Sequence, residues 1–233
     1  QLEDIILTIK PDIIVNLAAI SSSAYAYHNP VETVNVNGMV SVNICEIIFK
    51  NNLNTVLFNA SSSEIYKGHI KYNVKDNDNN MYHNHPYSIA KIMGHSMVDF
   101  YRNTYNLPFS NGVIFTSESP RKTGNFLLNK IVKHAKGWLG SKREPLILLG
   151  GLESYRNYIH SYDVATAIHK IIEQPTGDNY LICGFYIICL LNMVINVYDY
   201  CGIKVYPLGN KLIEEGTYRM VVSMENTSME TDK

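Results

Sequence analysis

The chain has 233 residues, 46% hydrophobic and 18% charged, which is the composition of a globular protein with a sizeable core. Its net charge of -1 gives no support for a surface that binds nucleic acid or membranes. No apolar run reaches membrane-spanning length, and the four cysteines and eight histidines show no metal or redox spacing. We therefore expect a globular, metal-free protein of a reducing compartment, the cytoplasm.

The chain opens directly on a helical pattern, with Leu2, Ile5, Ile6 and Ile9 at the spacing of a core-facing stripe. Its first residue is glutamine rather than methionine, and no signal-peptide pattern precedes the helix. We therefore expect that the natural beginning of the protein is missing from this sequence.

Strands and helices alternate through the first half of the chain. The predicted elements after the opening helix are a strand over 13–17, a helix over about 31–49, a strand over 54–59, a long helix that ends near residue 105, and a strand over 112–116. The strands are continuous apolar runs, as in a parallel sheet covered on both faces. The alternation predicts an α/β fold with a parallel, doubly wound, Rossmann-like sheet that lacks its first strands.

A polar, low-complexity loop is predicted over 67–82, before the long helix. The second half of the chain has a different pattern of elements. Beyond residue 119 the patterns predict helices over 126–135 and 164–172 and a strand over 146–149. We predict a partial cofactor-binding domain over 1–118 and a smaller, mainly substrate-binding α/β region over 119–233.

Polar or small residues follow each of the three strands. Ligands of such sheets bind beyond the carboxyl ends of the strands. Asn16 to Ala19 follow the first strand, Ser61 to Glu64 the second, and Phe115 to Ser117 the third. These three segments are predicted to converge on one edge of the sheet.

Tyr87 and Lys91 are the central candidates for chemistry. They lie four residues apart in a helical pattern and so share one face. A nearby ammonium is expected to lower the pKa of the phenol, which can then exchange a proton with a sugar hydroxyl. Ser62 would orient the substrate oxygen and Glu64 would be a second base. Taken alone, the pair could be an ordinary surface pair and the serines a turn or helix cap.

These residues resemble the extended short-chain dehydrogenase/reductase family and, within it, the GDP-mannose 4,6-dehydratases. The similarity runs from Pro11 to about Gly184. Its marks are Asn16-Leu17-Ala18-Ala19, Ser61-Ser62-Ser63-Glu64-Ile65-Tyr66, Tyr87-Ser88-Ile89-Ala90-Lys91, Glu118-Ser119-Pro120-Arg121 and Arg156-Asn157-Tyr158. The glutamate-serine-proline-arginine stretch is the most specific, because it separates this family from most sugar-nucleotide epimerases.

The resemblance implies a dehydration of GDP-mannose to GDP-4-keto-6-deoxymannose with bound NADP, a step toward GDP-fucose and other deoxyhexoses. Tyr87 would take the C4 hydroxyl proton, Ser62 would bond the C4 oxygen, and Glu64 would remove the C5 proton. Lys91 would also hold the nicotinamide ribose. The resemblance further implies cofactor contacts from Leu17, Ala18, Ala19, Ile20, Ser117 and Lys122, together with Tyr87 and Lys91. Asn125, Lys130 and Arg156 match positions that bind the nucleotide diphosphate.

The chain also departs from the family. The glycine-rich turn that cradles the pyrophosphate is absent, as is whatever selects NADP over NAD. Ile20, Glu32, Ser117 and Lys122 replace a glutamine, a tyrosine, a histidine and an arginine. One alternative is therefore a decayed fragment that cannot hold NADP, which is favoured if 233 residues is the natural length. A related nucleotide-sugar epimerase or dehydratase is another, although Glu64 argues against a simple epimerase. Self-association into a homo-oligomer stays open.

Overall fold

The computed structural model describes residues 1–66, 84–123, 126–141, 147–150, 155–184, 187–189, 212–214 and 217–220. The predicted polar loop over 67–82 and the candidate Asn125 lie outside these residues. The chain divides into two compact units, the first made of 1–117 with 159–184 and the second of 118–158 with 185–233. Each unit is described by itself.

The first unit is built on a parallel sheet of four strands in the order β1-β2-β3-β7. The strands are β1 (Ile13–Asn16), β2 (Val56–Ser62), β3 (Phe109–Ile114) and β7 (Asn179–Ile182). Each neighbouring pair runs parallel. The predicted parallel α/β sheet is therefore confirmed, and the carboxyl ends of its strands share one edge.

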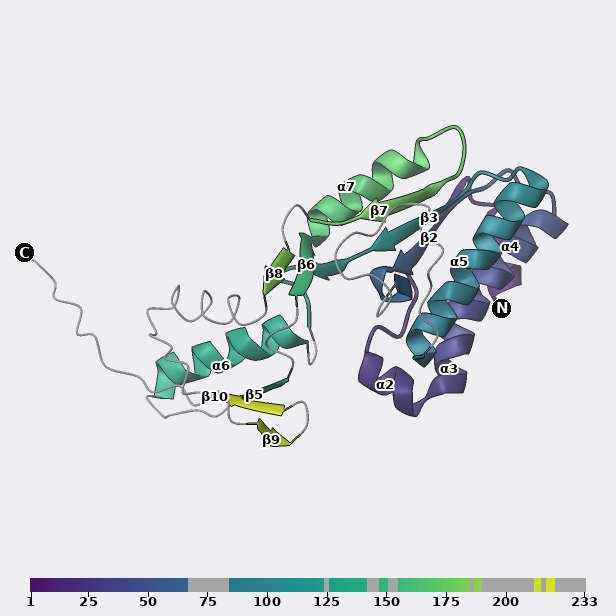
Figure 1. Ribbon diagram of the computed structural model, residues 1–233. Helices are drawn as coiled ribbons and strands as arrows, with labels where there is room; N and C mark the ends of the chain where they lie inside the picture. The colour runs from purple at the N-terminus through teal and green to yellow at the C-terminus, as the bar shows by residue number, and fades with distance from the viewer. Residues whose placement is uncertain are drawn as a thin grey trace, which may run out of the picture. The chain divides into compact units, whose positions relative to one another are not determined.

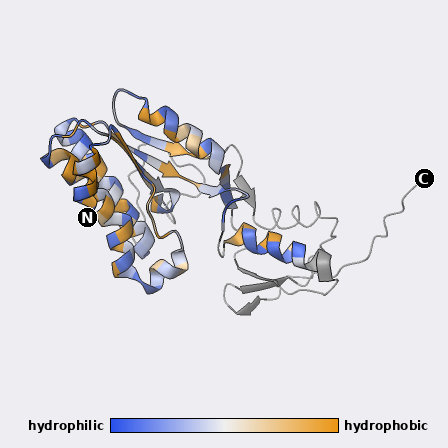
Figure 2. Ribbon diagram, turned by 180° about the vertical axis from the view of Figure 1, so that it is seen from behind, coloured by the Kyte–Doolittle hydropathy of each residue, from blue (hydrophilic) through white to orange (hydrophobic). Residues whose placement is uncertain are grey.

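Helices cover both faces of this sheet (Figure 1). They are α1 (Leu2–Ile9), α2 (Ser23–His28), α3 (Pro30–Val34), the π-helical η1 (Asn35–Met39), α4 (Val40–Lys50), the 3-10 turn η2 (Ser63–Tyr66), α5 (Pro86–Tyr105) and α7 (Ser161–Ile172). Helices α4 and α5 pack on one face around Leu57 and Phe109, and α7 packs on the other around Phe58 and Ile182. Figure 2 shows apolar residues in both the strands and the covering helices, so burial of apolar surface holds these layers together.

Local signals set the ends of α5. His85 caps its first turn, because the His85 Nδ1 atom accepts a hydrogen bond from the Tyr87 amide at 3.1 Å. Pro86 occupies the first helical position, where its missing N–H costs nothing. Asn106 ends the helix in the left-handed conformation, with φ of 56°. The predicted end near residue 105 is confirmed.

Two strand boundaries differ from the prediction by three residues, and other strand ends of this sheet differ by one or two. Strand β2 continues to Ser62, although the sequence predicted an end at Asn59, because its pairing with β3 extends through Ser61↔Val113 and Ser62↔Ile114. Strand β3 begins at Phe109 rather than residue 112, since the same pairing already holds at Leu57↔Phe109. Ser61 and Ser62 are therefore the last residues of a strand, and not part of a loop.

A row of asparagines crosses the whole sheet. Asn16, Asn59, Asn111 and Asn179 occupy matching positions on the four strands. Their amides are linked in sequence, with nitrogen to oxygen distances of 3.0 Å from Asn16 to Asn59, 2.9 Å from Asn59 to Asn111 and 3.1 Å from Asn111 to Asn179. The Ser41 hydroxyl of α4 also donates to Asn59 at 2.8 Å. Polar groups buried under the helices are thus paired with one another.

The second unit contains helix α6 (Leu127–Ser141) and several short strands, namely β5 (Ile147–Gly150), β8 (Ile187–Cys189), β9 (Leu212–Glu214) and β10 (Thr217–Met220). Strand β10 pairs antiparallel with β5 and β9. Strands β4 (Thr116–Glu118) and β6 (Tyr155–His160) each have residues in both units. Among the described helices, none combines the length and apolar character needed to cross a membrane.

Candidate active site

Strand β2 and helix α5 bring Ser62, Tyr87 and Lys91 together. Lys91 lies on the buried face of α5, and its Nζ atom donates a hydrogen bond to the Ala60 carbonyl of β2 at 2.7 Å. Tyr87, one turn earlier on α5, is half-buried and makes a side-chain hydrogen bond with Ser62. The phenol, the hydroxyl and the ammonium therefore gather at the carboxyl end of β2.

Glu64 joins this group from the 3-10 turn that follows β2. Its amide donates to the Ser62 Oγ atom at 3.3 Å, and its carbonyl accepts a hydrogen bond from the Ser88 hydroxyl of α5 at 3.0 Å. The Glu64 carboxylate is close enough to raise the pKa of Tyr87 by its charge. The four predicted catalytic residues thus lie together, with the backbone of residue 64 tied to both elements.

The electrostatics differ from the sequence prediction. The pKa of Tyr87 is raised, first by burial and also by the Glu64 charge, while the hydrogen bond with Ser62 lowers it. The predicted lowering of the Tyr87 pKa is wrong, because burial of the phenol outweighs the hydrogen bond with Ser62, and the Lys91 ammonium donates to the Ala60 carbonyl. Burial lowers the pKa of Lys91 to about 8. In the chain alone Tyr87 is therefore a neutral phenol near neutral pH.

The predicted cofactor loop follows β1 at the same edge of the sheet. Leu17, Ala18 and Ala19 are exposed. The Ile20 amide donates to the Asn37 Oδ1 atom at 2.7 Å, and the Asn37 Nδ2 atom donates back to the Ile20 carbonyl at 3.0 Å. This double hydrogen bond fixes the loop from behind, so its exposed face is preformed.

The remaining candidates lie on β4 and in the second unit. Ser117 is a residue of β4. The Lys122 ammonium pairs with Glu118 at 2.8 Å and lies 4.4 Å from the ring centroid of Phe126. Lys130 on α6 and Arg156 on β6 are exposed, and Arg156 donates to the Tyr155 carbonyl at 3.1 Å. Ser117 belongs to the first unit and Lys122, Lys130 and Arg156 to the second, and the binding roles of all four stay predictions.

Sequence reasoning missed a polar stripe on the buried face of α5. Lys91, His95, Asp99 and Arg102 follow at intervals of four, four and three residues, so they lie along one side of the helix. Two sequence signals could have revealed this stripe: polar residues that recur at helical spacing, and asparagines that interrupt apolar strands. Such residues are rarely buried without partners, and their pairing could be found only with the sheet in place.

Solved structures that resemble this fold include nucleotide-sugar epimerases and a nucleotide-sugar dehydratase. The dTDP-glucose 4,6-dehydratase of Bacillus anthracis, solved in complex with NAD, superposes with a TM-score of 0.72 at 24% identity over 86% of this chain and 60% of its own. An RMD structure from Pseudomonas aeruginosa, complexed with NADPH, gives a TM-score of 0.72 at 16% identity over 82% of this chain and 66% of its own. The fold is therefore that of a Rossmann-like α/β protein.

The family model described as GDP-mannose 4,6 dehydratase matches residues 1–231, so the chain belongs to that family. A GDP-mannose 4,6 dehydratase 2 of Caenorhabditis elegans is 27% identical over 91% of this chain and 54% of its own length. A GDP-mannose 4,6 dehydratase of Drosophila melanogaster is 30% identical over 78% of this chain and 46% of its own length. The chain thus spans about half the length of these relatives.

Proposed function

We propose that this chain carries the catalytic residues of an NADP-dependent GDP-mannose 4,6-dehydratase. The observation that supports this most directly is the gathering of Ser62, Tyr87 and Lys91, with the Glu64 carboxylate close enough to act on the phenol. A phenol and a carboxylate beside one another provide two separate groups for proton transfer. That pair suits a reaction in which one sugar ring loses protons from two neighbouring positions.

In this proposal Tyr87 and Ser62 act at C4 of the mannose ring. Ser62 donates a hydrogen bond to the C4 oxygen, and Tyr87 takes the C4 hydroxyl proton while hydride leaves the same carbon. Because burial raises the pKa of Tyr87, the phenolate must be stabilised when the site is loaded. The buried Lys91 ammonium is the cation nearest at hand on α5 for that purpose.

Glu64 acts at the next carbon. The ketone at C4 makes the C5 proton acidic, and the Glu64 carboxylate removes it. The electron pair left at C5 then expels the C6 hydroxyl as water, with the proton returned from Glu64. The remaining C5–C6 double bond is reduced by hydride at C6 and, at C5, by the proton that Tyr87 took from the C4 hydroxyl, which gives the 4-keto-6-deoxy sugar.

The residues present fit a nicotinamide dinucleotide. A lysine ammonium has three N–H donors, and with one directed to Ala60 the others suit ribose hydroxyls. The preformed loop presents the small residues Ala18 and Ala19 at the carboxyl end of β1, where a dinucleotide approaches the backbone. When bound, NADP would supply the hydride acceptor for C4 and the hydride donor for C6. Leu17, Ile20, Ser117 and Lys122 complete the proposed contacts.

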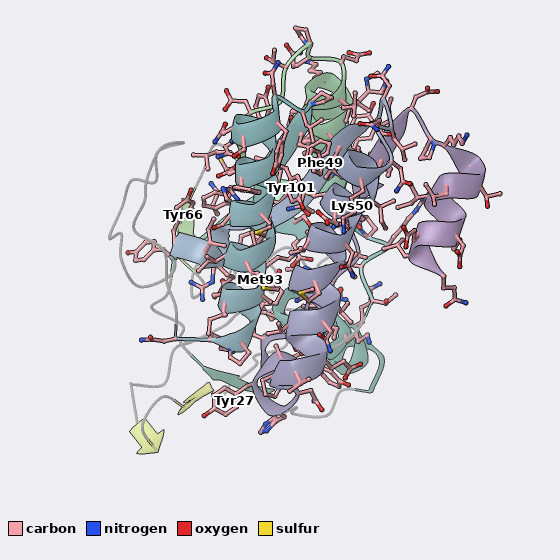
Figure 3. All side chains as sticks on the ribbon, turned by 90° about the vertical axis from the view of Figure 1, so that its right-hand side faces the viewer. Tyr27, Phe49, Lys50, Tyr66, Met93 and Tyr101 are labelled. Atoms are coloured by element: carbon pink, nitrogen blue, oxygen red, sulfur yellow. The ribbon has the colours of Figure 1, made fainter. Side chains whose placement is uncertain are left out.

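The proposal extends to the nucleotide diphosphate, the compartment and the oligomeric state. Asn125, Lys130 and Arg156 are proposed to bind the nucleotide diphosphate through amide and cationic donors. Cys45 and Cys183, among the described residues, are free thiols, which suits the cytoplasm as the compartment. A homo-oligomer is proposed through α4 and α5, which lie side by side (Figure 3), with Phe100 and Tyr105 of α5 exposed.

The function is tested by mixing the chain with NADP and GDP-mannose. We expect saturable NADP binding in equilibrium dialysis and loss of one water from the sugar nucleotide by mass spectrometry. Glu64→Gln should bind NADP as the parent does but lower turnover by about 100-fold or more, because it removes the second base. The matched control is Glu173→Gln on the exposed end of α7, which should change neither quantity.

Two results would contradict the proposal. If the chain fails to bind NADP, the decayed fragment that cannot hold the cofactor becomes the better description. If it binds NADP but Glu64→Gln dehydrates GDP-mannose at the parent's rate, Glu64 has no part in the reaction.

A further inference from the structure

A second group of polar side chains, with Ser61 and His95 buried and Asp99 partly exposed, lies next to the candidate site. The Ser61 Oγ atom is 3.0 Å from the His95 Nδ1 atom, and the His95 Nε2 atom is 3.4 Å from the Asp99 Oδ2 atom. Ser61 and His95 expose 4% and 3% of their surfaces. Serine, histidine and aspartate therefore form a linear row between the end of β2 and the middle of α5.

This row has the composition of a hydrolytic triad, but its position excludes that role. A nucleophilic serine must meet its substrate, and Ser61 is buried. A carboxylate only accepts hydrogen bonds, so the bond to Asp99 requires the proton on His95 Nε2. In the neutral ring, Nδ1 then accepts from the Ser61 hydroxyl. The row thus fixes the orientation of Ser61.

Ser61 stands between the two β2 residues that contact the candidate catalytic side chains. The carbonyl of Ala60 before it accepts the Lys91 hydrogen bond, and Ser62 after it bonds Tyr87. Lys91 and His95 lie on successive turns of α5 and on the same face of the helix. Two successive turns of α5 therefore bond two successive residues of β2. These two contacts fix the position of α5 along its axis relative to the end of β2.

The far end of the row is held as firmly. Asp99 accepts hydrogen bonds from Arg102 at 2.7 Å, from Asn111 at 2.9 Å and from Asn179 at 3.2 Å. These donors come from α5, β3 and β7. His95 is thus oriented by a carboxylate that donors from three elements keep in place. The His95 ring, and with it the hydrogen bond to Ser61, therefore has little freedom to move.

We infer that His95 is a positioning residue of the candidate active site, acting through Ser61 to hold the Ala60 carbonyl against the Lys91 ammonium and Ser62 against Tyr87. The catalytic meaning of this arrangement depends on the proposed function. The arrangement itself does not, so it can be tested on the chain without cofactor or substrate.

The test follows the titration of Lys91 by NMR on the isotope-labelled chain. Ser61→Ala removes one oxygen and breaks the bond to His95, and His95→Leu breaks it from the other side. When the Ala60 carbonyl is released, the buried ammonium loses its acceptor, so the pKa of Lys91 should fall below its value of about 8. The double variant should match the single variants rather than add to them, because both changes break the same bond.

Ile171→Ala is the matched control. Ile171 packs in the core on the opposite face of the sheet, so this variant should lower the melting temperature and leave the Lys91 pKa unchanged. An unchanged Lys91 pKa in Ser61→Ala and His95→Leu would overturn the inference, whatever their melting temperatures. A rise in that pKa would overturn it too, since it would mean that the row only keeps water out. If His95→Leu does not fold, Ser61→Ala alone decides.

Discussion

Lys91 is the buried charge on which the candidate site depends. It exposes 6% of its surface, and the Ala60 carbonyl accepts one of its hydrogen bonds. Burial disfavours the ammonium and lowers its pKa from 10.5 to about 8. Folding therefore holds this lysine in an unfavourable environment, which is common where a side chain is kept for chemistry rather than stability.

The lowered pKa of Lys91 makes the stability of the folded chain depend on pH. The unfolded chain binds this proton more tightly, so stability rises with pH between about 8 and 10.5, and the full penalty is present below about 8. Lys91→Met removes the titration. We expect the stability difference between variant and parent to move in the parent's favour by about 3 kcal/mol across this window.

Urea unfolding at a series of pH values measures this difference. Lys170→Met on the exposed face of α7 is the control and should show no comparable pH dependence. A Lys91→Met curve parallel to the parent curve from pH 7 upward would show that Lys91 titrates normally.

At the scale of elements, the asparagine row ties the strands to each other and to α5. Asn111 is fully buried, and its amide donates to Asn179, to Asp99 and to the His95 carbonyl while accepting from Asn59. Because the row crosses every strand of the sheet at one level, it fixes the strand register. A one-residue slip of any of these strands would break the amide contacts that its asparagine makes with the neighbouring strands.

Asn111→Leu should therefore destabilise the chain strongly. It keeps a similar side-chain size but leaves the Asp99 carboxylate, the Asn59 amide and the His95 carbonyl short of a partner, which costs about 3 kcal/mol or more. Denaturant unfolding gives this value. Asn103→Leu on the exposed side of α5 is the control, and we expect it to be near neutral. Equal stabilities of the two variants would mean that the row contributes nothing to stability.

At the scale of the molecule, two apolar surfaces of the first unit are open to partners. Phe100 and Tyr105 on α5 expose 45% and 41% of their surfaces and contact each other edge to face. Ile13 and Val15 on β1, the outer strand of the described sheet, expose 45% and 40%. Apolar patches and unpaired strand edges both favour association.

One substitution on each surface shows which of the two forms the interface of the proposed homo-oligomer. If α4 and α5 form the interface, light scattering on the eluting chain should give a dimer that Phe100→Asp converts to a monomer. Val15→Lys on the strand edge should leave the dimer intact. The reverse result would place self-association at β1, and a monomeric parent chain would contradict the homo-oligomer.

The local sequence located most of the elements of the first unit and the edge where the site lies. Apolar runs mark strands and periodic apolar residues mark helices whatever surrounds them, so the segments around Val15, Phe58 and Val98 were identified correctly. The catalytic candidates were also predicted, because Tyr87 and Lys91 are neighbours on one helix and Ser62 and Glu64 follow one strand.

Tertiary structure alone decided the energetics and the register. The pKa of Tyr87 rises rather than falls, first because the packing of α5 against β2 removes the phenol from water and also because the nearby Glu64 charge opposes its ionisation. The strand ends moved because pairing with a neighbour prolongs a strand beyond its apolar run. The asparagine row joins residues 43 to 68 positions apart, and the Ser61–His95 contact joins residues 34 positions apart. Such pairings arise only when folding closes the loops between them.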